Sequence, residues 1–205
     1  MKNVAIVDYG MCNLDSVRRA VEECGGKAVV TDDAKHLRSA DHLILPGVGS
    51  YAEAMDQLRG RGLDALLVEL VEKGVPFLGI CLGMQLMASR GEEGRKCAGL
   101  GIVPGEVRRL EPDGRDTRIP HVGWNDVSPV RESPLFDGIG RERDFYFVHS
   151  YHFVCEDPRH VLARTPYCGG FVSAISSRPT VYGVQFHPEK SQKAGFQLLR
   201  NFVAL

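Results

Sequence analysis

The chain has 205 residues, of which 43% are hydrophobic and 25% are charged, and its formal net charge is -1. This composition is that of a globular protein with one large or two small domains, and the balanced charge excludes bulk attraction to nucleic acid or to an acidic membrane. The apolar run near the amino terminus is too short for a secretion signal and no long uncharged span follows, so we expect a cytoplasmic protein that binds neither nucleic acid nor membranes.

The first half of the sequence alternates strand-like and helix-like segments. Apolar runs typical of buried strands occupy residues 4–7, 27–31, 42–45 and 75–80. Helical periodicity covers residues 14–24 and 63–74. Repeated βα units of this kind predict an α/β fold with a central, mostly parallel sheet covered by helices.

Beyond about residue 99 the sequence becomes rich in short strands separated by turn residues. The strand-like segments cover residues 106–110, 118–130, 144–155 and 169–189. Residues 193–205 close the chain as a helix, with Phe196, Leu199 and Val203 at helical spacing. Because no internal repeat or linker is found, we predict a single α/β domain over residues 1–205 with antiparallel strands in its second half.

The cysteines and histidines do not form a recognisable metal-binding pattern. The six cysteines lie at wide, irregular spacings without a Cys-x-x-Cys pair, so the sequence predicts neither a disulfide framework nor a zinc site. His149 and His152 lie three apart in one strand-like run and would face opposite sides, which argues against a shared metal site. We therefore predict no metal and expect a structural role for His149.

One cysteine lies in a motif typical of nucleophiles. Gly79-Ile80-Cys81-Leu82-Gly83 follows an apolar run and has the spacing of an elbow in which a strand turns sharply into a helix and exposes a nucleophile. A helix that begins near Leu82 would direct N–H groups and its positive dipole end at Cys81, which favours the thiolate. The motif alone is equally compatible with a buried structural cysteine in a tight turn.

A general base for this thiol is found far downstream, in His187-Pro188-Glu189. Residues two apart in an extended chain face the same side, so Glu189 is able to accept a hydrogen bond from the His187 ring and orient its other nitrogen. A surface histidine beside a glutamate is the ordinary alternative. Together with Cys81, however, the two residues predict a Cys-His-Glu relay.

The loop after the third predicted strand has two interpretations. Gly47-x-Gly49-x-x-Ala52 fits the loose dinucleotide-binding fingerprint. That fingerprint belongs after a first strand, and here it competes with the stronger elbow motif, so we predict no cofactor.

Seven segments in this order resemble the class I (triad) glutamine amidotransferases, and most closely the glutaminase subunits of imidazole glycerol phosphate synthase: VDYGMCNLDSV, LPGVGSY, GICLGMQLM, EEGRKCAGLGIVPG, PHVGWN, YFVHSYH and GVQFHPEKS. The resemblance implies a three-layer fold of the flavodoxin-like or α/β-hydrolase-like kind. It also implies a nucleophile at Cys81, a base at His187 and an orienting acid at Glu189. These residues would release ammonia from L-glutamine through a γ-glutamyl thioester that water converts to glutamate.

The resemblance also assigns the groups that would bind glutamine. The oxyanion site is assigned to Gly47, Val48, Gly49 and Leu82, and the amino-acid end of glutamine to Gln85, Glu93 and the backbone of Ser150 and Tyr151. Two backbone N–H donors, from Val48 and Leu82, would contribute several kcal/mol, taking roughly 3 kcal/mol for each. A solvated surface charge is the alternative for Glu93.

The same resemblance implies a heterodimer with a β/α-barrel cyclase subunit, which uses the ammonia to form imidazole glycerol phosphate and AICAR from PRFAR in histidine biosynthesis. The positions that would face this partner are Asn13, Trp124, Asn125, Tyr146 and Lys190. Cys12 stands where the family often has glycine, which leaves the geometry of that loop open. A tryptophan is also an ordinary core anchor.

Three other functions stay open from the sequence. A paralogous subunit would supply ammonia to another acceptor, such as a surface-sugar precursor. A non-catalytic interaction subunit would keep the fold with an idle pocket, although the three predicted catalytic residues argue against it. A free-standing cysteine hydrolase would act on peptides or simple amides without a partner.

Overall fold

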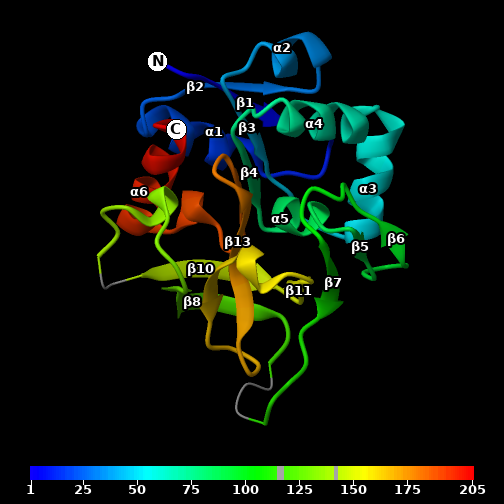
Figure 1. Cartoon of the computed structure of the whole chain (residues 1–205), viewed down its shortest axis with the longest axis vertical. Helices are drawn as coiled ribbons and strands as arrows, with labels where there is room; N and C mark the ends of the chain where they lie inside the picture. The colour runs from blue at the N-terminus through cyan, green and yellow to red at the C-terminus, as the bar shows by residue number, and fades with distance from the viewer. Residues whose placement is uncertain (115–117, 141–142) are drawn as a thin grey trace.

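The computed structural model describes residues 1–114, 118–140 and 143–205, and its described strands form one large mixed sheet and one small sheet (Figure 1). The strands of the large sheet are β1 (Asn3–Val7), β2 (Lys27–Thr31), β3 (His42–Leu45), β4 (Phe77–Ile80), β5 (Arg90–Gly91), β6 (Cys97–Ala98), β7 (Gly105–Arg109), β9 (Ser128–Pro129), β11 (Tyr151–Cys155), β12 (Val161–Thr165), β13 (Phe171–Arg178) and β14 (Val181–Val184). The small sheet consists of β8 (His121–Asp126) and β10 (Asp144–His149).

The spatial order of the large sheet is β2-β1-β3-β4-β14-β13-β11-β7-β5-β6, and β12 pairs with both β13 and β9. Pairing is parallel from β2 through β14. From β14 to β13, β11 and β7 it is antiparallel. The parallel first half and antiparallel-leaning second half predicted from the sequence are therefore confirmed. As a consequence, β4 and β14, which are about a hundred positions apart in the chain, lie side by side.

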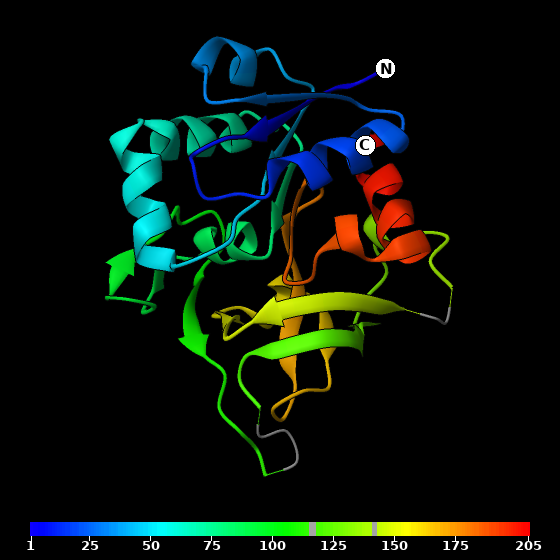
Figure 2. The same ribbon diagram turned by 180° about the vertical axis from the view of Figure 1, so that it is seen from behind.

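Helices cover both faces of the large sheet and make three layers (Figures 1 and 2). Adjacent strand residues point to opposite faces, and so the side chains divide between two hydrophobic clusters: Val7 belongs to one and Ile6 to the other. One face is covered by α2 (Ala34–Arg38), α3 (Tyr51–Gly60), α4 (Leu63–Glu72) and α5 (Leu82–Leu86). The other is covered by α1 (Leu14–Glu23), α6 (Gln192–Val203) and the small sheet.

The structure differs from the predicted elements in several places. Helices α2 and α3 and strand β12 were not predicted. α2 and β12 have only five residues each, and α3, with ten, packs in a cluster with residues distant in sequence. Residues 144–155 do not form one strand. β10 ends at His149 in the small sheet, and after Ser150 the chain continues as β11 in the large sheet. His149 and His152 are therefore on different strands, which corrects the geometric reason given above for separating them.

Candidate active site

Cys81 lies at a sharp turn between a strand and a helix. β4 ends at Ile80, α5 begins at Leu82, and the backbone of Cys81 between them has φ of +53° and ψ of -111°. Positive φ strains a residue other than glycine, and such strain gathers at functional sites. The Cys81 N–H donates to the Val184 carbonyl at 2.8 Å, which ties the turn to the neighbouring strand. The structure therefore contains the predicted elbow, at the carboxyl end of β4.

The helix that follows the elbow is shorter than the motif suggests. α5 has only five residues, so its dipole is weak compared with that of a long helix. The N–H groups of its first turn have no acceptor inside the helix and are the groups nearest to Cys81 along the chain. Stabilisation of a Cys81 thiolate would therefore come from these individual N–H groups and from nearby side chains, and not from the helix dipole that the sequence predicted.

The two glycines around Cys81 are required because no space exists for a side chain. A Cβ on Gly79 would lie 2.7 Å from the Gly83 carbonyl oxygen. A Cβ on Gly83 would lie 1.7 Å from the carbonyl oxygen of Leu45. The close packing of α5 against β3 and β4 therefore depends on both glycines.

We expect Gly83→Ala to lower the free energy of unfolding by about 3 kcal/mol or more, because the added methyl group would force the elbow away from Leu45. Gly60→Ala is the matched control, since nothing lies within 4 Å of a Cβ at that position at the end of α3. Alanine there favours the helix by up to about 1 kcal/mol. Urea unfolding measures both variants, and equal stability of the two would contradict this account.

His187 and Glu189 make the predicted contact, although not by the predicted backbone geometry. His187 Nδ1 lies 2.8 Å from Glu189 Oε1, and both side chains are buried. The strand β14 ends at Val184, and Pro188–Lys190 form a turn of 3-10 helix, η3. His187 itself is extended, as the residue before a proline prefers, and the turn then brings the carboxylate back to its ring.

The second ring nitrogen of His187 faces the candidate nucleophile. Nε2 is buried and has no well-aligned hydrogen-bond partner among the described residues. Burial by itself would lower the pKa of His187, but the nearby polar groups and charges of Cys81 and Glu189 outweigh it and raise the pKa to about 10. The raised pKa favours the protonated form of the His187 ring.

A cavity of about 310 Å³ opens at Cys81 and His187. Its lining residues are Val48, Gly49, Cys81, Leu82, Gln85, Glu93, Pro120, Val148, His149, Ser150, Tyr151 and His187. The predicted oxyanion and glutamine-binding residues thus gather around the thiol, with one exception. Gly47 lies behind the lining, packed so closely that a Cβ would be 2.2 Å from the Tyr9 hydroxyl. Pro120, Val148 and His149 were not predicted for this pocket and carry no sequence signal for it.

The loop assigned to the oxyanion site has its N–H turned away from the cavity. The Val48 N–H donates to the Met11 carbonyl at 2.9 Å. Gly49, which follows, has φ of +103°, a conformation that favours glycine. Leu82 is the first residue of α5, so its N–H has no acceptor within the helix. In this conformation one of the two predicted donors is therefore engaged elsewhere.

The residues assigned to the amino-acid end of glutamine are polar and half-buried or buried. Glu93 accepts a hydrogen bond at 3.1 Å from the N–H of Tyr51, the first residue of α3, so it is not a freely solvated charge. Burial raises the pKa of Glu93, and the Tyr51 N–H opposes that shift. Gln85 donates to the Tyr151 carbonyl at 2.9 Å. The Ser150 carbonyl accepts the Leu110 N–H at 2.9 Å.

An apolar surface lies beside the cavity on the small sheet. Strand pairing sets Val122 beside Val148 and Trp124 beside Tyr146, and we call these four outward-facing residues the β8–β10 face. Trp124 is 48% exposed and meets the Tyr146 ring edge to face, with 6.1 Å between centroids. Lys190 Nζ lies 5.8 Å from the Tyr146 ring centroid. Exposed large apolar side chains in a group indicate an interaction surface.

Two of the predicted partner-facing residues do not join the β8–β10 face. Asn125 is half-buried and follows Trp124 on β8, so its side chain points to the opposite side, where Nδ2 contacts His121 Nε2 at 3.2 Å. Asn13 is exposed and precedes α1. Val122 and Val148 were missed, although alternation along each strand could have indicated them from Trp124 and Tyr146.

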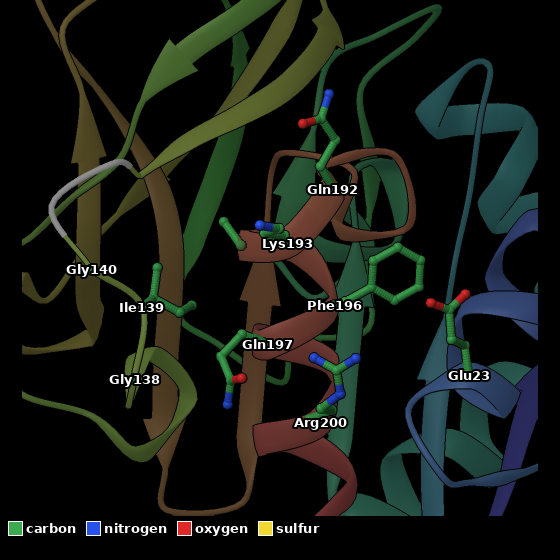
Figure 3. Close-up of a pocket in the computed structure, with 10 residues that line it drawn as sticks. Glu23, Gly138, Ile139, Gly140, Gln192, Lys193, Phe196, Gln197 and Arg200 are labelled. Carbon is green, nitrogen blue, oxygen red and sulfur yellow. The ribbon is translucent and has the colours of Figure 1, made fainter.

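A larger cavity, of about 890 Å³, lies between α6 and the segment around Gly138 (Figure 3). Its lining, as far as the structure describes it, includes Glu23, Lys193 and Arg200 but no cysteine or histidine.

None of the helices within residues 1–114, 118–140 and 143–205 is long and apolar enough to cross a membrane. In those residues, no group of three or more His, Cys, Asp or Glu side chains is arranged to hold a metal ion.

The fold and the thiol site together are those of an amidotransferase. The family model described as glutamine amidotransferase class-I matches residues 5–205, and the chain belongs to this family. It is similar to imidazole glycerol phosphate synthase subunit HisH 2 of Nitrobacter winogradskyi, with 48% identity over 99% of this chain and 98% of that protein. It is equally similar to imidazole glycerol phosphate synthase subunit HisH of Moorella thermoacetica, with 48% identity over 98% of this chain and 94% of that protein.

Solved structures support the same fold. A structure described as glutamine amidotransferase superposes with a TM-score of 0.74 at 21% identity and covers 98% of this chain and 97% of its own. The structure of PurLQS from Thermotoga maritima superposes with a TM-score of 0.76 at 18% identity, covering 100% and 99% of the two chains. The predicted family and its three-layer α/β fold are confirmed.

Proposed function

We propose that the chain is the glutaminase subunit of an imidazole glycerol phosphate synthase and hydrolyses L-glutamine to glutamate and ammonia. The observation that carries this proposal is Cys81 on its strained elbow, facing a His187 ring that Glu189 holds. Family membership and near-full-length similarity to subunits named HisH support it. We further propose that residues 1–205 act as one amidotransferase domain in the cytoplasm.

The proposed reaction begins with attack of the Cys81 thiolate on the side-chain amide carbon of glutamine. The C–S bond forms, and the carbonyl becomes a tetrahedral oxyanion. His187 then transfers its Nε2 proton to the amide nitrogen, the C–N bond breaks, and ammonia leaves a γ-glutamyl thioester. Water, deprotonated by His187, attacks the thioester and releases glutamate and the thiolate. Glu189 stabilises the charged imidazole throughout.

Oxyanion stabilisation requires a change at Val48 in this mechanism. Its N–H is bonded to the Met11 carbonyl, so the peptide between Gly47 and Val48 must rotate before the N–H faces the cavity beside that of Leu82. The resting chain is therefore a poor glutaminase. A partner that favours the rotated peptide would activate it.

For glutamine binding, we propose that the Glu93 carboxylate receives the α-ammonium group and that Gln85 contacts the amino-acid end, with the backbone of Ser150 and Tyr151 along one wall. Glu93 and Gln85 both line the cavity at Cys81. The side chain of glutamine then extends towards the sulfur. This arrangement selects an amino acid that carries a terminal amide.

We propose that the β8–β10 face, with Lys190 and the exposed Asn13, receives a β/α-barrel cyclase subunit in a heterodimer. The face is apolar, adjoins the cavity through Val148, and so offers ammonia a short route into the partner. The cyclase would use the ammonia to form imidazole glycerol phosphate and AICAR from PRFAR in histidine biosynthesis. Asn125, on the inner side of β8, would act at this interface only indirectly.

The test is glutamate release with and without the purified cyclase. We expect slow release by the chain alone, strong activation by the cyclase, and about tenfold or more weaker cyclase binding for Trp124→Ala, because large aromatic side chains dominate such interfaces. Val130→Ala is the matched control, since Val130 is 54% exposed but follows strand β9 of the other sheet. Activation by no cyclase would refute the pathway assignment, and equal binding of both variants would refute the face.

A further inference from the structure

The candidate nucleophile has a buried neighbour that the mechanism above does not use. Gln185 directly follows β14 and is fully buried. Its backbone N–H donates to the Ser173 carbonyl at 2.9 Å, which holds the residue in place. Its side-chain Nε2 donates to Cys81 Sγ at 3.7 Å, and its Oε1 accepts a hydrogen bond from Gln85 Nε2 at 3.0 Å. The sulfur therefore has a side-chain amide as hydrogen-bond donor.

The orientation of this amide is determined by its other partners. The Tyr151 carbonyl only accepts hydrogen bonds, so the end of Gln85 that contacts it at 2.9 Å must be Nε2. Gln85 uses the same nitrogen for its bond to Gln185, which must therefore present its oxygen there. As a result the nitrogen of Gln185, with its hydrogen atoms, is the end that faces Cys81.

The Tyr151 carbonyl also accepts a second hydrogen bond. His149 Nδ1 donates to it at 2.8 Å, and His149 Nε2 lies 3.2 Å from Nδ1 of His121. Burial lowers the pKa of His149 to about 3, so the ring is neutral and its single proton is on Nδ1. The structural role expected for His149 is therefore to hold the Tyr151 carbonyl, which orients the side-chain amides of Gln85 and Gln185.

A donor aimed at sulfur distinguishes between the two states of Cys81. A thiol is a weak acceptor, whereas a thiolate is a charged acceptor and binds an N–H strongly. The bond weakens again once sulfur becomes a thioester. Gln185 therefore acts on the resting nucleophile, and its action differs from that of the Val48 and Leu82 N–H groups, which would serve the oxyanion.

We propose that Gln185 is a positioning residue for the proposed glutaminase reaction: its side-chain N–H holds the Cys81 sulfur in the thiolate form and directs it into the cavity, while Gln85 and the Tyr151 carbonyl keep that N–H in place. The proposal rests on the proposed function for its meaning in catalysis. The hydrogen bond to sulfur is measurable without any turnover, however, so failure of one is distinguishable from failure of the other.

The test is the pH dependence of Cys81 alkylation by iodoacetamide in the full chain, read by peptide mass spectrometry. Gln185→Met removes the donor at similar volume, and we expect about tenfold slower alkylation at neutral pH and a midpoint about one pH unit higher. Gln185→Glu keeps an oxygen for Gln85 but turns an acceptor towards sulfur, so its midpoint should rise further. Cys81→Ala reports the background from the other cysteines. Burial raises the pKa of Cys12 and Cys24 to about 11, so these thiols react slowly.

Profiles of both Gln185 variants that overlie the profile of the natural chain would overturn the proposal. So would a shift in Gln185→Met but none in Gln185→Glu, because that result would reduce Gln185 to a support for Gln85. If neither variant folds, nuclear magnetic resonance of the natural chain decides. The Gln185 side-chain amide signal should titrate together with Cys81 and lose this titration in Cys81→Ala. An amide signal that does not move with Cys81 ionisation would refute the bond.

Discussion

Cys81→Ala is expected to reduce glutamine hydrolysis by at least about 1000-fold, because Cys81 is the only thiol among the described residues that line the cavity. The measurement is glutamate release by the chain in complex with the proposed cyclase. Synthesis of imidazole glycerol phosphate from added ammonia should be unchanged in the same complex, since in the proposed function that reaction takes place on the partner. The variant would thus lose the glutamine-dependent activity and keep the ammonia-dependent one.

Alanine is a suitable replacement because it adopts the backbone of Cys81 at φ of +53° with no greater strain than cysteine. The side chain is small and 6% exposed, so its loss leaves little empty volume. Thermal unfolding and cyclase binding serve as controls for folding. Loss of both activities together would contradict the proposed division of labour, and residual hydrolysis near the natural rate would refute the nucleophile.

Glu189→Gln is expected to slow glutamine hydrolysis on the order of 1000-fold while preserving the shape of the site. The amide oxygen of glutamine is still able to accept the His187 Nδ1 hydrogen, but the negative charge that stabilises the imidazolium is gone. Glu189 is one of the groups that raise the pKa of His187 to about 10, so its removal lowers that pKa. Activity that needs the protonated ring should therefore fail at a lower pH in the variant.

The sign of this shift distinguishes charge from shape. A raised histidine pKa keeps the ring protonated up to a higher pH, and the protonated form is lost as the pH rises through that pKa. Neutralising the carboxylate therefore moves the alkaline limb of the rate profile to lower pH. The His187 pKa, followed by nuclear magnetic resonance in the chain alone, should move in the same direction. Lys193→Gln, on the exposed start of α6, is the control for removing a charge outside the site. An unchanged alkaline limb would refute the role of the carboxylate.

Features set by short-range patterns were predictable from the sequence. The apolar runs at 27–31 and 42–45 coincide with β2 and β3, and the helical pattern from Leu14 coincides with α1. The elbow at Cys81 and the contact of His187 with Glu189 also follow from neighbours within a few positions. Each of these depends on sterics or on side-chain periodicity, which act locally along the chain.

Predictions that assumed an extended chain succeeded less well. The bond between His187 and Glu189 forms across a 3-10 turn, and the run that holds His149 and His152 divides between two sheets. Trp124 and Asn125 were assigned to one surface but point to opposite sides of β8. In each case the pattern indicated the correct strand-forming residues, whereas turns and sheet pairing far along the chain set the direction of the side chains.

By itself, then, the sequence determined the α/β class, the elbow and the residue types of a thiol amidotransferase, because the spacing of apolar residues and glycines acts between near neighbours in the chain. Only the tertiary structure decided what meets that thiol. Parallel pairing of β4 with β14 carries Gln185 and His187 to Cys81 across about a hundred residues, and a backbone bond to Met11 turns the Val48 N–H away. Hydrogen-bond direction is a property of neighbours in space, and no local pattern encodes it.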